Sequence, residues 1–206
     1  MTDQPGDHPP PHPGLISQKP LIFTVKAGDV LHRHHRAEKD PIYFGTSGAN
    51  RFDDPDCPAS HAFGVLYAGE DPQCCFIESC GPTTGVPAVS GAYLDARAMA
   101  SLELTEDLRF IDLYSTGGLT RIGADGRLFT GSYKIAQQWS AALRAHPSKP
   151  AGIRYPSRHD HTRVACAIYS RPVSSFKVGS LGSLMAPTNR SLLNQMGDPP
   201  ALPGWQ

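Results

Sequence analysis

The sequence has no long apolar stretch and no excess charge of either sign. No run of about 18 or more apolar residues occurs, so no segment is long enough to cross a membrane as a helix. Lysine plus arginine and aspartate plus glutamate number 19 each, so no net charge attracts nucleic acid or anionic lipid. The first residues are acidic and proline-rich, whereas a signal peptide begins with basic residues and an apolar core. We therefore expect a cytoplasmic protein that binds neither membranes nor nucleic acid directly.

Several motifs that define common enzyme classes are also missing. No GxSxG, Walker A or GxGxxG pattern occurs, which excludes the α/β-hydrolase, P-loop and dinucleotide-fold classes. No CxxC pair occurs either, and the odd number of cysteines, five, argues against a disulfide framework. Cys74, Cys75 or Cys80 could act as a nucleophile, but nothing in the sequence pairs one of them with a histidine. Small buried thiols are the commoner role of cysteine.

Nine histidines are the feature most suggestive of a metal site. His32 and His34 would share one face of a strand, as would His159 and His161, so a four-histidine site is conceivable. No histidine pair with i, i+4 spacing lies on a recognisable helix. Histidines in polar loops are the simpler interpretation, and we expect no metal.

The length of 206 residues favours one domain with a substantial core. Residues 1–19 combine proline, histidine and aspartate with few large apolar side chains, so we expect a disordered tail. Residues 20–206 are expected to form the single domain. After about residue 172 the chain is rich in serine, glycine and proline, and we expect mainly loops there.

Short strands and two helices are predicted within this domain. Asp71 is a good N-cap ahead of Pro72 and predicts a helix over 72–79, while apolar periodicity predicts a helix over 133–145. Residues 94–106 mix both periodicities and stay unassigned. The pattern indicates a mixed α+β class with strands at 21–25, 30–33, 64–68, 108–113, 152–155 and 164–169.

Two arginines and a glutamate stand out between residues 30 and 80. Arg33 follows a short apolar approach, Arg51 follows the turn at residues 45–50, and Glu78 follows the apolar run 74–77. The guanidinium group of an arginine can donate two parallel hydrogen bonds to the oxygens of one phosphate. A carboxylate among apolar residues keeps its negative charge only if a positive group lies opposite it. Taken singly, such a residue is more often a surface residue than a functional one. Together they predict an anionic ligand with a centre of developing positive charge.

The order of these residues resembles the RES domain family, named for its Arg, Glu and Ser. The resemblance runs from about residue 21 to residue 169. His34 stands where an aromatic or aliphatic residue is frequent, and Asp53 replaces the familiar asparagine. The matching positions are Leu31-His32-Arg33, Gly48-Ala49-Asn50-Arg51-Phe52, Val65-Leu66-Tyr67-Ala68, Cys75-Phe76-Ile77-Glu78 and the late serine Ser157.

The resemblance implies an ADP-ribosyltransferase-like α+β fold, with short strands in a split sheet and a few helices. It also implies NAD+ as the substrate, with cleavage of the nicotinamide–ribose bond and no metal. Such proteins are typically toxins paired with an Xre-type helix-turn-helix antitoxin. The acceptor stays open among water, phosphate and a protein, which correspond to a glycohydrolase, a phosphorylase and an ADP-ribosyltransferase.

The resemblance also assigns roles to particular residues. Cleavage passes through an oxocarbenium-like centre, which a fixed carboxylate such as Glu78 would stabilise. Arg33 and Arg51 would hold phosphate groups through two hydrogen bonds each and complete the catalytic set.

Four further residues are expected to bind the nucleotide. Tyr67 would stack on the nicotinamide ring, and Ser157 would hydrogen-bond a ribose hydroxyl or the carboxamide. His34 and Arg158 adjoin Arg33 and Ser157 and are expected to line the pocket. Two other functions remain open, namely a non-catalytic nucleotide-binding or interaction module and a metal-dependent hydrolase.

Overall fold

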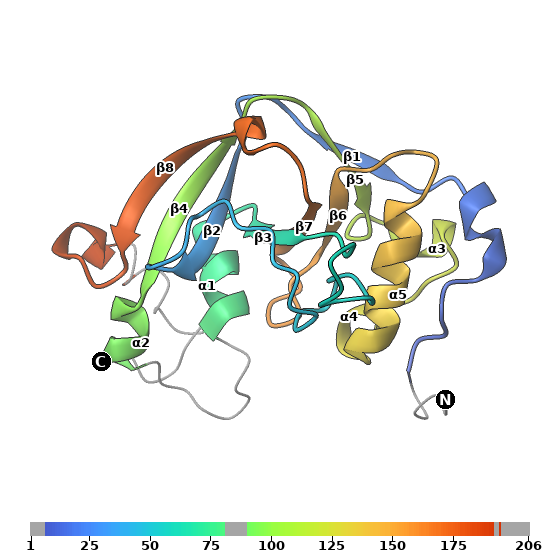
Figure 1. Cartoon of the computed structure of the whole chain (residues 1–206), viewed down its shortest axis with the longest axis horizontal. Helices are drawn as coiled ribbons and strands as arrows, with labels where there is room; N and C mark the ends of the chain where they lie inside the picture. The colour runs from blue at the N-terminus through green and yellow to red at the C-terminus, as the bar shows by residue number, and fades with distance from the viewer. Residues whose placement is uncertain (1–6, 81–89, 192–193, 195–206) are drawn as a thin grey trace.

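A curled sheet of eight strands forms the centre of the molecule (Figure 1). The computed structural model describes residues 7–80, 90–191 and 194. The strand order is β1-β5-β6-β7-β3-β2-β4-β8, and only the pair of β5 and β6 is parallel. The strands are β1 (Ile22–Val25), β2 (Val30–Arg36), β3 (Val65–Gly69), β4 (Arg97–Leu104), β5 (Leu108–Asp112), β6 (Gly152–Pro156), β7 (Val164–Tyr169) and β8 (Phe176–Ser183).

The two halves of this sheet are joined at a single residue pair. β2 pairs with β4 at seven positions and β3 pairs with β7 at five, but β2 and β3 pair only at His32 and Gly69. Beyond that pair the two strands diverge. The expected split sheet is therefore present as one sheet that opens between β2 and β3.

Helix α1 (Pro72–Cys80) packs beside this junction. Its Cys75 Sγ donates a hydrogen bond to the carbonyl of His32 on β2, at 2.9 Å. A Cβ atom at Gly69 would lie 2.9 Å from Cys75 Sγ and 3.0 Å from Cys74 Cβ. Glycine at the end of β3 therefore allows the helix to approach both strands.

The predicted N-cap of α1 is confirmed. Asp71 Oδ1 accepts a hydrogen bond from the amide of Cys74 at 2.8 Å, which satisfies a free N–H group of the first turn. Arg163 Nη1 donates to the same oxygen at 2.7 Å. The next turn buries residues 74–77, so Glu78 follows directly after the buried part of the helix.

The two faces of the sheet are packed in different ways. On one face, Trp139 and Leu143 of α5 (Tyr133–Arg144) pack against Ile111 and Ile153 of the sheet. On the other face, residues of β5 and β7 share a core with residues of β2 and β4, because the sheet curls over itself. The remaining helical segments are α2 (Gly91–Asp95), α3 (Gly118–Arg121), α4 (Arg127–Thr130), η1 (Pro13–Ser17), η2 (Val173–Ser175) and η3 (Pro187–Asn189). No helix of the described residues is long and apolar enough to cross a membrane.

The unassigned window 94–106 contains a boundary between elements. It begins with the last residues of α2 and continues into all eight residues of β4. A helical end followed at once by a strand explains why both periodicities occurred in one window.

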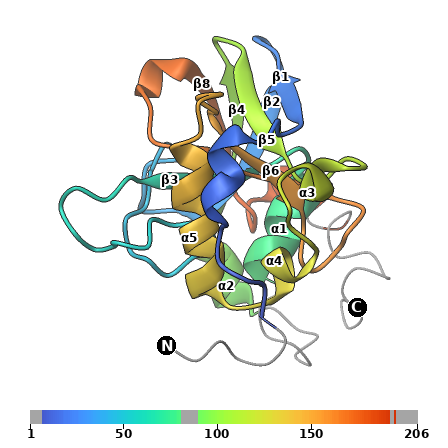
Figure 2. The same cartoon turned by 90° about the vertical axis from the view of Figure 1, so that its right-hand side faces the viewer.

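The expected disorder of the N-terminal tail is wrong for residues 7–19. This segment lies across α5 (Figure 2), where Trp139 Nε1 donates a hydrogen bond to the carbonyl of Pro9 at 2.9 Å. Leu15 is 4% exposed and belongs to the same core cluster as Trp139, and His8 is also buried. The composition of the segment suggested disorder because it contains few large apolar side chains. Its few contacts with helix α5 nevertheless offset the conformational entropy lost when the segment becomes ordered. Residues 1–6 lie outside the described residues.

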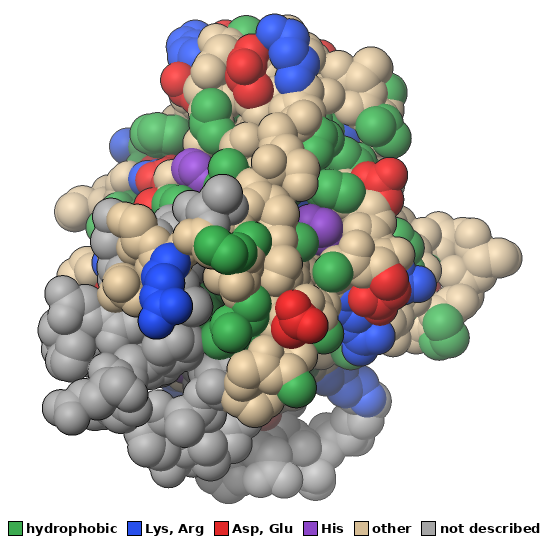
Figure 3. Space-filling model, turned by 90° about the vertical axis from the view of Figure 1, so that its left-hand side faces the viewer, with side chains coloured by type: hydrophobic (Ala, Val, Ile, Leu, Met, Phe, Trp, Pro, Cys, Tyr) green, Lys and Arg blue, Asp and Glu red, His purple; other side chains and the backbone are tan. Residues whose placement is uncertain are grey.

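The expectation of mainly loops after residue 172 is also wrong, because β8 pairs with β4 over seven register positions. Backbone pairing holds this strand, since Phe176 is its only buried residue. Val178 and Leu181 on β8 and Met185 just after it are exposed apolar residues. The face of the molecule in Figure 3 carries apolar side chains scattered among charged and polar ones. The predicted weak structure of the last ten residues lies outside the described residues.

The packing of the N-terminal segment predicts the effect of one core substitution. Leu15→Ala should lower the free energy of unfolding by about 2–5 kcal/mol, because it leaves a cavity beside the core. Chemical denaturation of the whole chain measures this. Ile16→Ala is the control, since Ile16 is 62% exposed and should change stability by less than about 0.5 kcal/mol. Equal and small effects of both variants would mean that the segment does not pack in solution.

Candidate functional site

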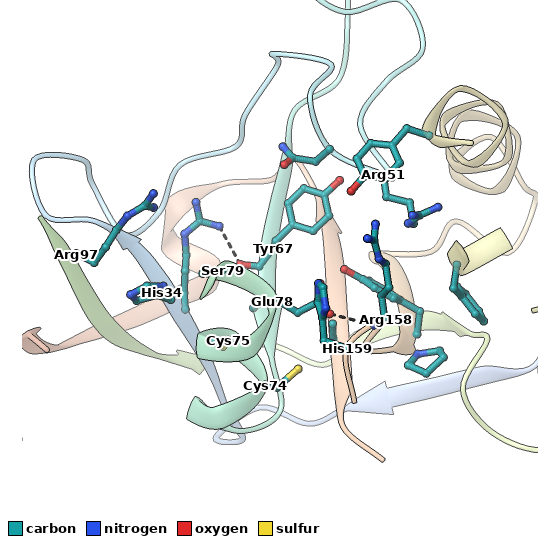
Figure 4. Close-up of a pocket in the computed structure, with 18 of the residues that line it drawn as sticks. His34, Arg51, Tyr67, Cys74, Cys75, Glu78, Ser79, Arg97, Arg158 and His159 are labelled. Atoms are coloured by element: carbon teal, nitrogen blue, oxygen red, sulfur yellow. Dashed lines mark hydrogen bonds between the residues drawn. The ribbon is translucent and has the colours of Figure 1, made fainter. Parts of the chain in front are cut away.

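A pocket of about 430 Å³ lies where β2 diverges from β3. His34 and Arg97 lie at one end and Arg51 and Arg158 at the other, with Tyr67 and Glu78 between them (Figure 4). The structure brings six of the seven predicted site residues into its lining, namely Arg33, His34, Arg51, Tyr67, Glu78 and Arg158. Ser157, the seventh, lies behind Glu78.

Glu78 is fixed through one of its two carboxylate oxygens. Ser157 Oγ donates a hydrogen bond to Glu78 Oε1 at 2.5 Å, and the backbone amide of Arg158 donates to the same oxygen at 3.1 Å. Both hydrogen bonds restrict the orientation of the carboxylate. The second oxygen, Oε2, can therefore face a ligand.

Ser157 is itself held by the turn that follows β6. Its Oγ accepts hydrogen bonds from the amides of His159 at 3.2 Å and Asp160 at 3.3 Å. The side chain is fully buried, and its hydroxyl proton is directed at Glu78. This position behind the carboxylate differs from the direct ligand contact predicted from the sequence.

Tyr67 on β3 has its hydroxyl group held on both sides. It accepts a hydrogen bond from the amide of Phe52 at 2.9 Å and donates one to Asp53 Oδ1 at 3.0 Å. Burial raises the pKa of Tyr67 well above its usual value, so the ring is a neutral phenol. Burial also raises the pKa of Asp53, although hydrogen bonds from Asn50 and Tyr67 oppose this. The Tyr67 ring is thus a rigid wall of the pocket.

Arg51 is held by the turn between α4 and α5. Its Nη1 donates hydrogen bonds to the carbonyls of Gly131 at 2.9 Å and Leu128 at 3.3 Å. The guanidinium carbon lies 4.4 Å from the centroid of the Tyr133 ring, within range of a cation–π contact. Burial lowers the pKa of Arg51, but an arginine side chain stays charged in proteins. Its Nη2 is buried and has no hydrogen-bond partner in the described part of the chain, so it is a donor suited to an anionic ligand.

Arg33 spans the opening between the two strands. Its Nη1 donates to the carbonyl of Tyr67 on β3 at 2.9 Å, and its Nη2 donates to the carbonyl of Tyr43 at 3.3 Å. Burial lowers the pKa of Arg33 to about 10, so the group is still cationic at neutral pH. Because both terminal nitrogens already bind carbonyls, a two-pronged contact with phosphate would compete with these bonds.

His34 forms the end of the pocket together with Arg97. Burial, together with the neighbouring Arg97 and His35, lowers the pKa of His34 to about 4. His34 is therefore neutral at neutral pH. Both of its ring nitrogens are buried without a hydrogen-bond partner among residues 7–80, 90–191 and 194.

The pocket also contains residues that the sequence analysis did not single out. Tyr133 begins a predicted helix and Tyr155 ends a predicted strand, so aromatic residues at element ends were the available signal. Arg97, whose guanidinium carbon lies 4.6 Å from the Tyr93 ring centroid, had no such signal because its strand was unassigned. The additional lining residues include Asn50, Tyr93, Arg97, Phe129, Tyr133 and Tyr155.

The cysteine and metal alternatives find little support in the geometry. Burial raises the pKa of Cys75 and Cys80 to about 12 and that of Cys74 higher still, whereas a nucleophilic cysteine needs a lowered pKa. Within the described ranges, no three or more His, Cys, Asp or Glu side chains are grouped to hold a metal ion. The four-histidine site, considered above only as an alternative to histidines in polar loops, does not form there.

Comparison with known proteins agrees with the fold and with the motif order. Over 95 residues the chain is 36% identical to the probable toxin y4kH of Sinorhizobium fredii (strain NBRC 101917 / NGR234). The aligned region covers 46% of this chain and 73% of that protein. The fold of the present chain is similar to that of a chain in the crystal structure of the M. tuberculosis MbcT-MbcA toxin–antitoxin complex. The TM-score is 0.58 at 16% identity, and the match covers 90% of this chain and 98% of that chain. This likeness confirms the predicted α+β fold class.

The family comparison covers most of the chain. A model of the RES domain matches residues 29–183, which include the site residues described above. The resemblance predicted from short motifs is thereby confirmed, and the chain belongs to the RES domain family.

Proposed function

We propose that this protein is an NAD+-consuming enzyme that cleaves the nicotinamide–ribose bond, and that it acts as the toxin of a toxin–antitoxin pair. The observation that carries the proposal is the carboxylate of Glu78, oriented by Ser157 and facing a pocket with cationic side chains at both ends. The similarity to a probable toxin and to a chain of a toxin–antitoxin complex supports the biological role. An Xre-type helix-turn-helix protein is the proposed antitoxin.

The chemistry requires little beyond a well-placed negative charge. When the bond between ribose C1′ and the nicotinamide nitrogen breaks, the electron pair leaves with nicotinamide and neutralises its positive charge. Positive charge then develops on C1′ and the ring oxygen of the ribose. A carboxylate whose orientation is fixed in advance lowers the energy of this state without having to reorganise. Glu78 fills that role, and an acceptor oxygen then forms the new bond to C1′.

Arg51 and Arg33 have different roles in the proposed function. Arg51 has a buried and unpaired Nη2, so we assign it to the pyrophosphate of NAD+, with the exposed Arg158 nearby in the lining. Arg33 uses its terminal nitrogens on backbone carbonyls, so its main part is to hold the pocket open. Tyr67 offers its ring as a surface on which nicotinamide can stack.

Turnover of NAD+ is the first test of this function. The wild-type protein should release nicotinamide, and mass spectrometry of the second product should identify the acceptor. Free ADP-ribose would indicate water, a phosphorylated ADP-ribose would indicate phosphate, and a mass increase of a protein would indicate transfer. Binding of NAD+ without nicotinamide release would contradict catalysis and favour a non-catalytic nucleotide-binding module.

Replacing the carboxylate tests the catalytic centre. Glu78→Gln keeps the size of the side chain and removes its charge, so kcat should fall about a hundredfold or more with the melting temperature little changed. Glu38→Gln is the matched control, because Glu38 is exposed in a turn and outside the pocket lining. Near-normal turnover by Glu78→Gln would remove Glu78 from the mechanism.

Removing the hydroxyl behind Glu78 tests its positioning. Ser157→Ala should lower kcat by about 10- to 100-fold, since a hydrogen bond to a charged group contributes about 1.5–3 kcal/mol. The KM for NAD+ should change little, because Ser157 does not line the pocket. Ser170→Ala, at an exposed serine, should behave as wild type. A rise in KM with unchanged kcat would instead indicate direct contact with the substrate.

Because Arg51 and Arg33 are assigned different roles, their substitution should change different quantities, namely the KM for NAD+ and the free energy of unfolding. Arg51→Lys should raise the KM for NAD+ about tenfold or more, because an ammonium group cannot replace the planar fork that binds Gly131 and a phosphate together. Arg33→Lys should lower the free energy of unfolding by about 1–3 kcal/mol through the loss of its carbonyl contacts. Arg36→Lys, on an exposed position of the same strand, should change neither quantity. An unchanged KM in Arg51→Lys would show that Arg51 is only structural.

A further inference from the structure

A short N-terminal segment, residues 7–9, contacts the turn that holds Arg51. This segment precedes residue 29, where the match to the RES domain begins. The turn comprises Gly131 and Ser132 between α4 and α5, and the carbonyl of Gly131 accepts the 2.9 Å hydrogen bond from Arg51 Nη1. The N-terminal segment therefore adds a support to the pocket from outside the matched domain.

Asp7 makes the closest contacts with this turn. Its Oδ1 accepts a hydrogen bond from the amide of Ser132 at 2.9 Å, and its backbone carbonyl accepts one from Arg127 Nη1 at 3.0 Å. A Cβ atom at Gly131 would lie 2.9 Å from Asp7 Oδ1, so the carboxylate lies directly over the glycine. The peptide plane that carries the Gly131 carbonyl also carries the Ser132 amide, so Asp7 restrains the orientation of both groups.

His8 and Pro9 fix the two elements on either side of the turn. His8 Nε2 accepts a hydrogen bond from the amide of Asp125, just before α4, at 3.1 Å. The His8 ring meets the Trp139 ring of α5 edge-on, with centroids 5.2 Å apart, and the carbonyl of Pro9 accepts from Trp139 Nε1. Both ends of the turn are thereby held against the same segment.

We propose that residues 7–9 are a positioning element for Arg51, and that Asp7 orients the peptide whose carbonyl aims the Arg51 guanidinium into the pocket. This inference rests on the proposed function, in which Arg51 binds the pyrophosphate of NAD+. The bond of the Gly131 carbonyl to Nη1 leaves the buried Nη2 unpaired and available for the ligand. Glu78 is held separately, by Ser157 and the amide of Arg158, so loss of Asp7 affects substrate binding more than the chemical step.

A double-mutant cycle tests this coupling in the full-length chain. Asp7→Ala removes the acceptor for the Ser132 amide and should raise the KM for NAD+ about fivefold, the size of one hydrogen bond, with kcat little changed. Asp7→Asn keeps an acceptor oxygen and should restore a KM close to that of wild type. Ile16→Ala, at an exposed position of the same N-terminal region, should have no effect.

The decisive comparison is made in the Arg51→Lys background. If Asp7 acts through Arg51, then Asp7→Ala should add nothing to the KM of Arg51→Lys, because coupled residues are not additive. The full fivefold increase in that background, or an unchanged KM in the single variant, would overturn the proposal.

A measurement without NAD+ separates this proposal from the proposed function. In NMR spectra of the ¹⁵N-labelled protein, the Arg51 guanidinium signals can be assigned through their loss in Arg51→Lys. Asp7→Ala should accelerate the exchange of these N–H protons with water, and Asp7→Asn should not. Unchanged exchange in Asp7→Ala would overturn the positioning role even if the enzyme consumes NAD+. Failure of wild-type turnover would contradict the proposed function and leave this readout intact.

Discussion

The single pairing of β2 with β3 is the constraint on which the rest of the site depends. At His32 and Gly69 the two halves of the sheet are joined, and beyond this pair the strands separate and form the pocket. The lack of a side chain at Gly69 lets α1 pack against both strands. Glu78 occupies its place because the helix that carries it lies at this junction. The same divergence leaves the carbonyl of Tyr67 without a strand partner on β2, and Arg33 provides the missing donor.

The pocket concentrates positive charge around one fixed carboxylate, and its arginines illustrate two uses of the same side chain. Arg33 uses its terminal N–H groups on backbone carbonyls, whereas Arg51 uses one terminal nitrogen on a turn and keeps the other unpaired. Both guanidinium groups are largely removed from water, which makes their hydrogen bonds stronger and an unpaired donor more costly. An anionic ligand at Arg51 would remove that cost.

Local signals in the sequence predicted much of this arrangement. The N-cap at Asp71, the apolar face of the helix around Trp139 and the short apolar strands are properties of neighbouring residues, so they can be read without tertiary information. The pocket-lining positions of Arg33, Arg51, Tyr67 and Glu78 followed from the order of short motifs. The packing of Leu15, the pairing of β8 and the contact of Ser157 with Glu78 depend on residues far away in sequence. Composition and periodicity contain no information about such contacts. The predictions of a disordered N-terminal tail and of loops after residue 172 were wrong for this reason, and Arg97 on β4 was missed.

The most direct test of the account is a crystal structure of the Glu78→Gln variant with NAD+. Loss of the charge should slow cleavage enough for the intact nucleotide to be observed. The account predicts C1′ of the nicotinamide ribose beside the side chain of residue 78, nicotinamide against the ring of Tyr67, and the pyrophosphate within hydrogen-bond distance of Arg51 Nη2. Density for NAD+ away from the opening between β2 and β3, or with the pyrophosphate remote from Arg51, would contradict it.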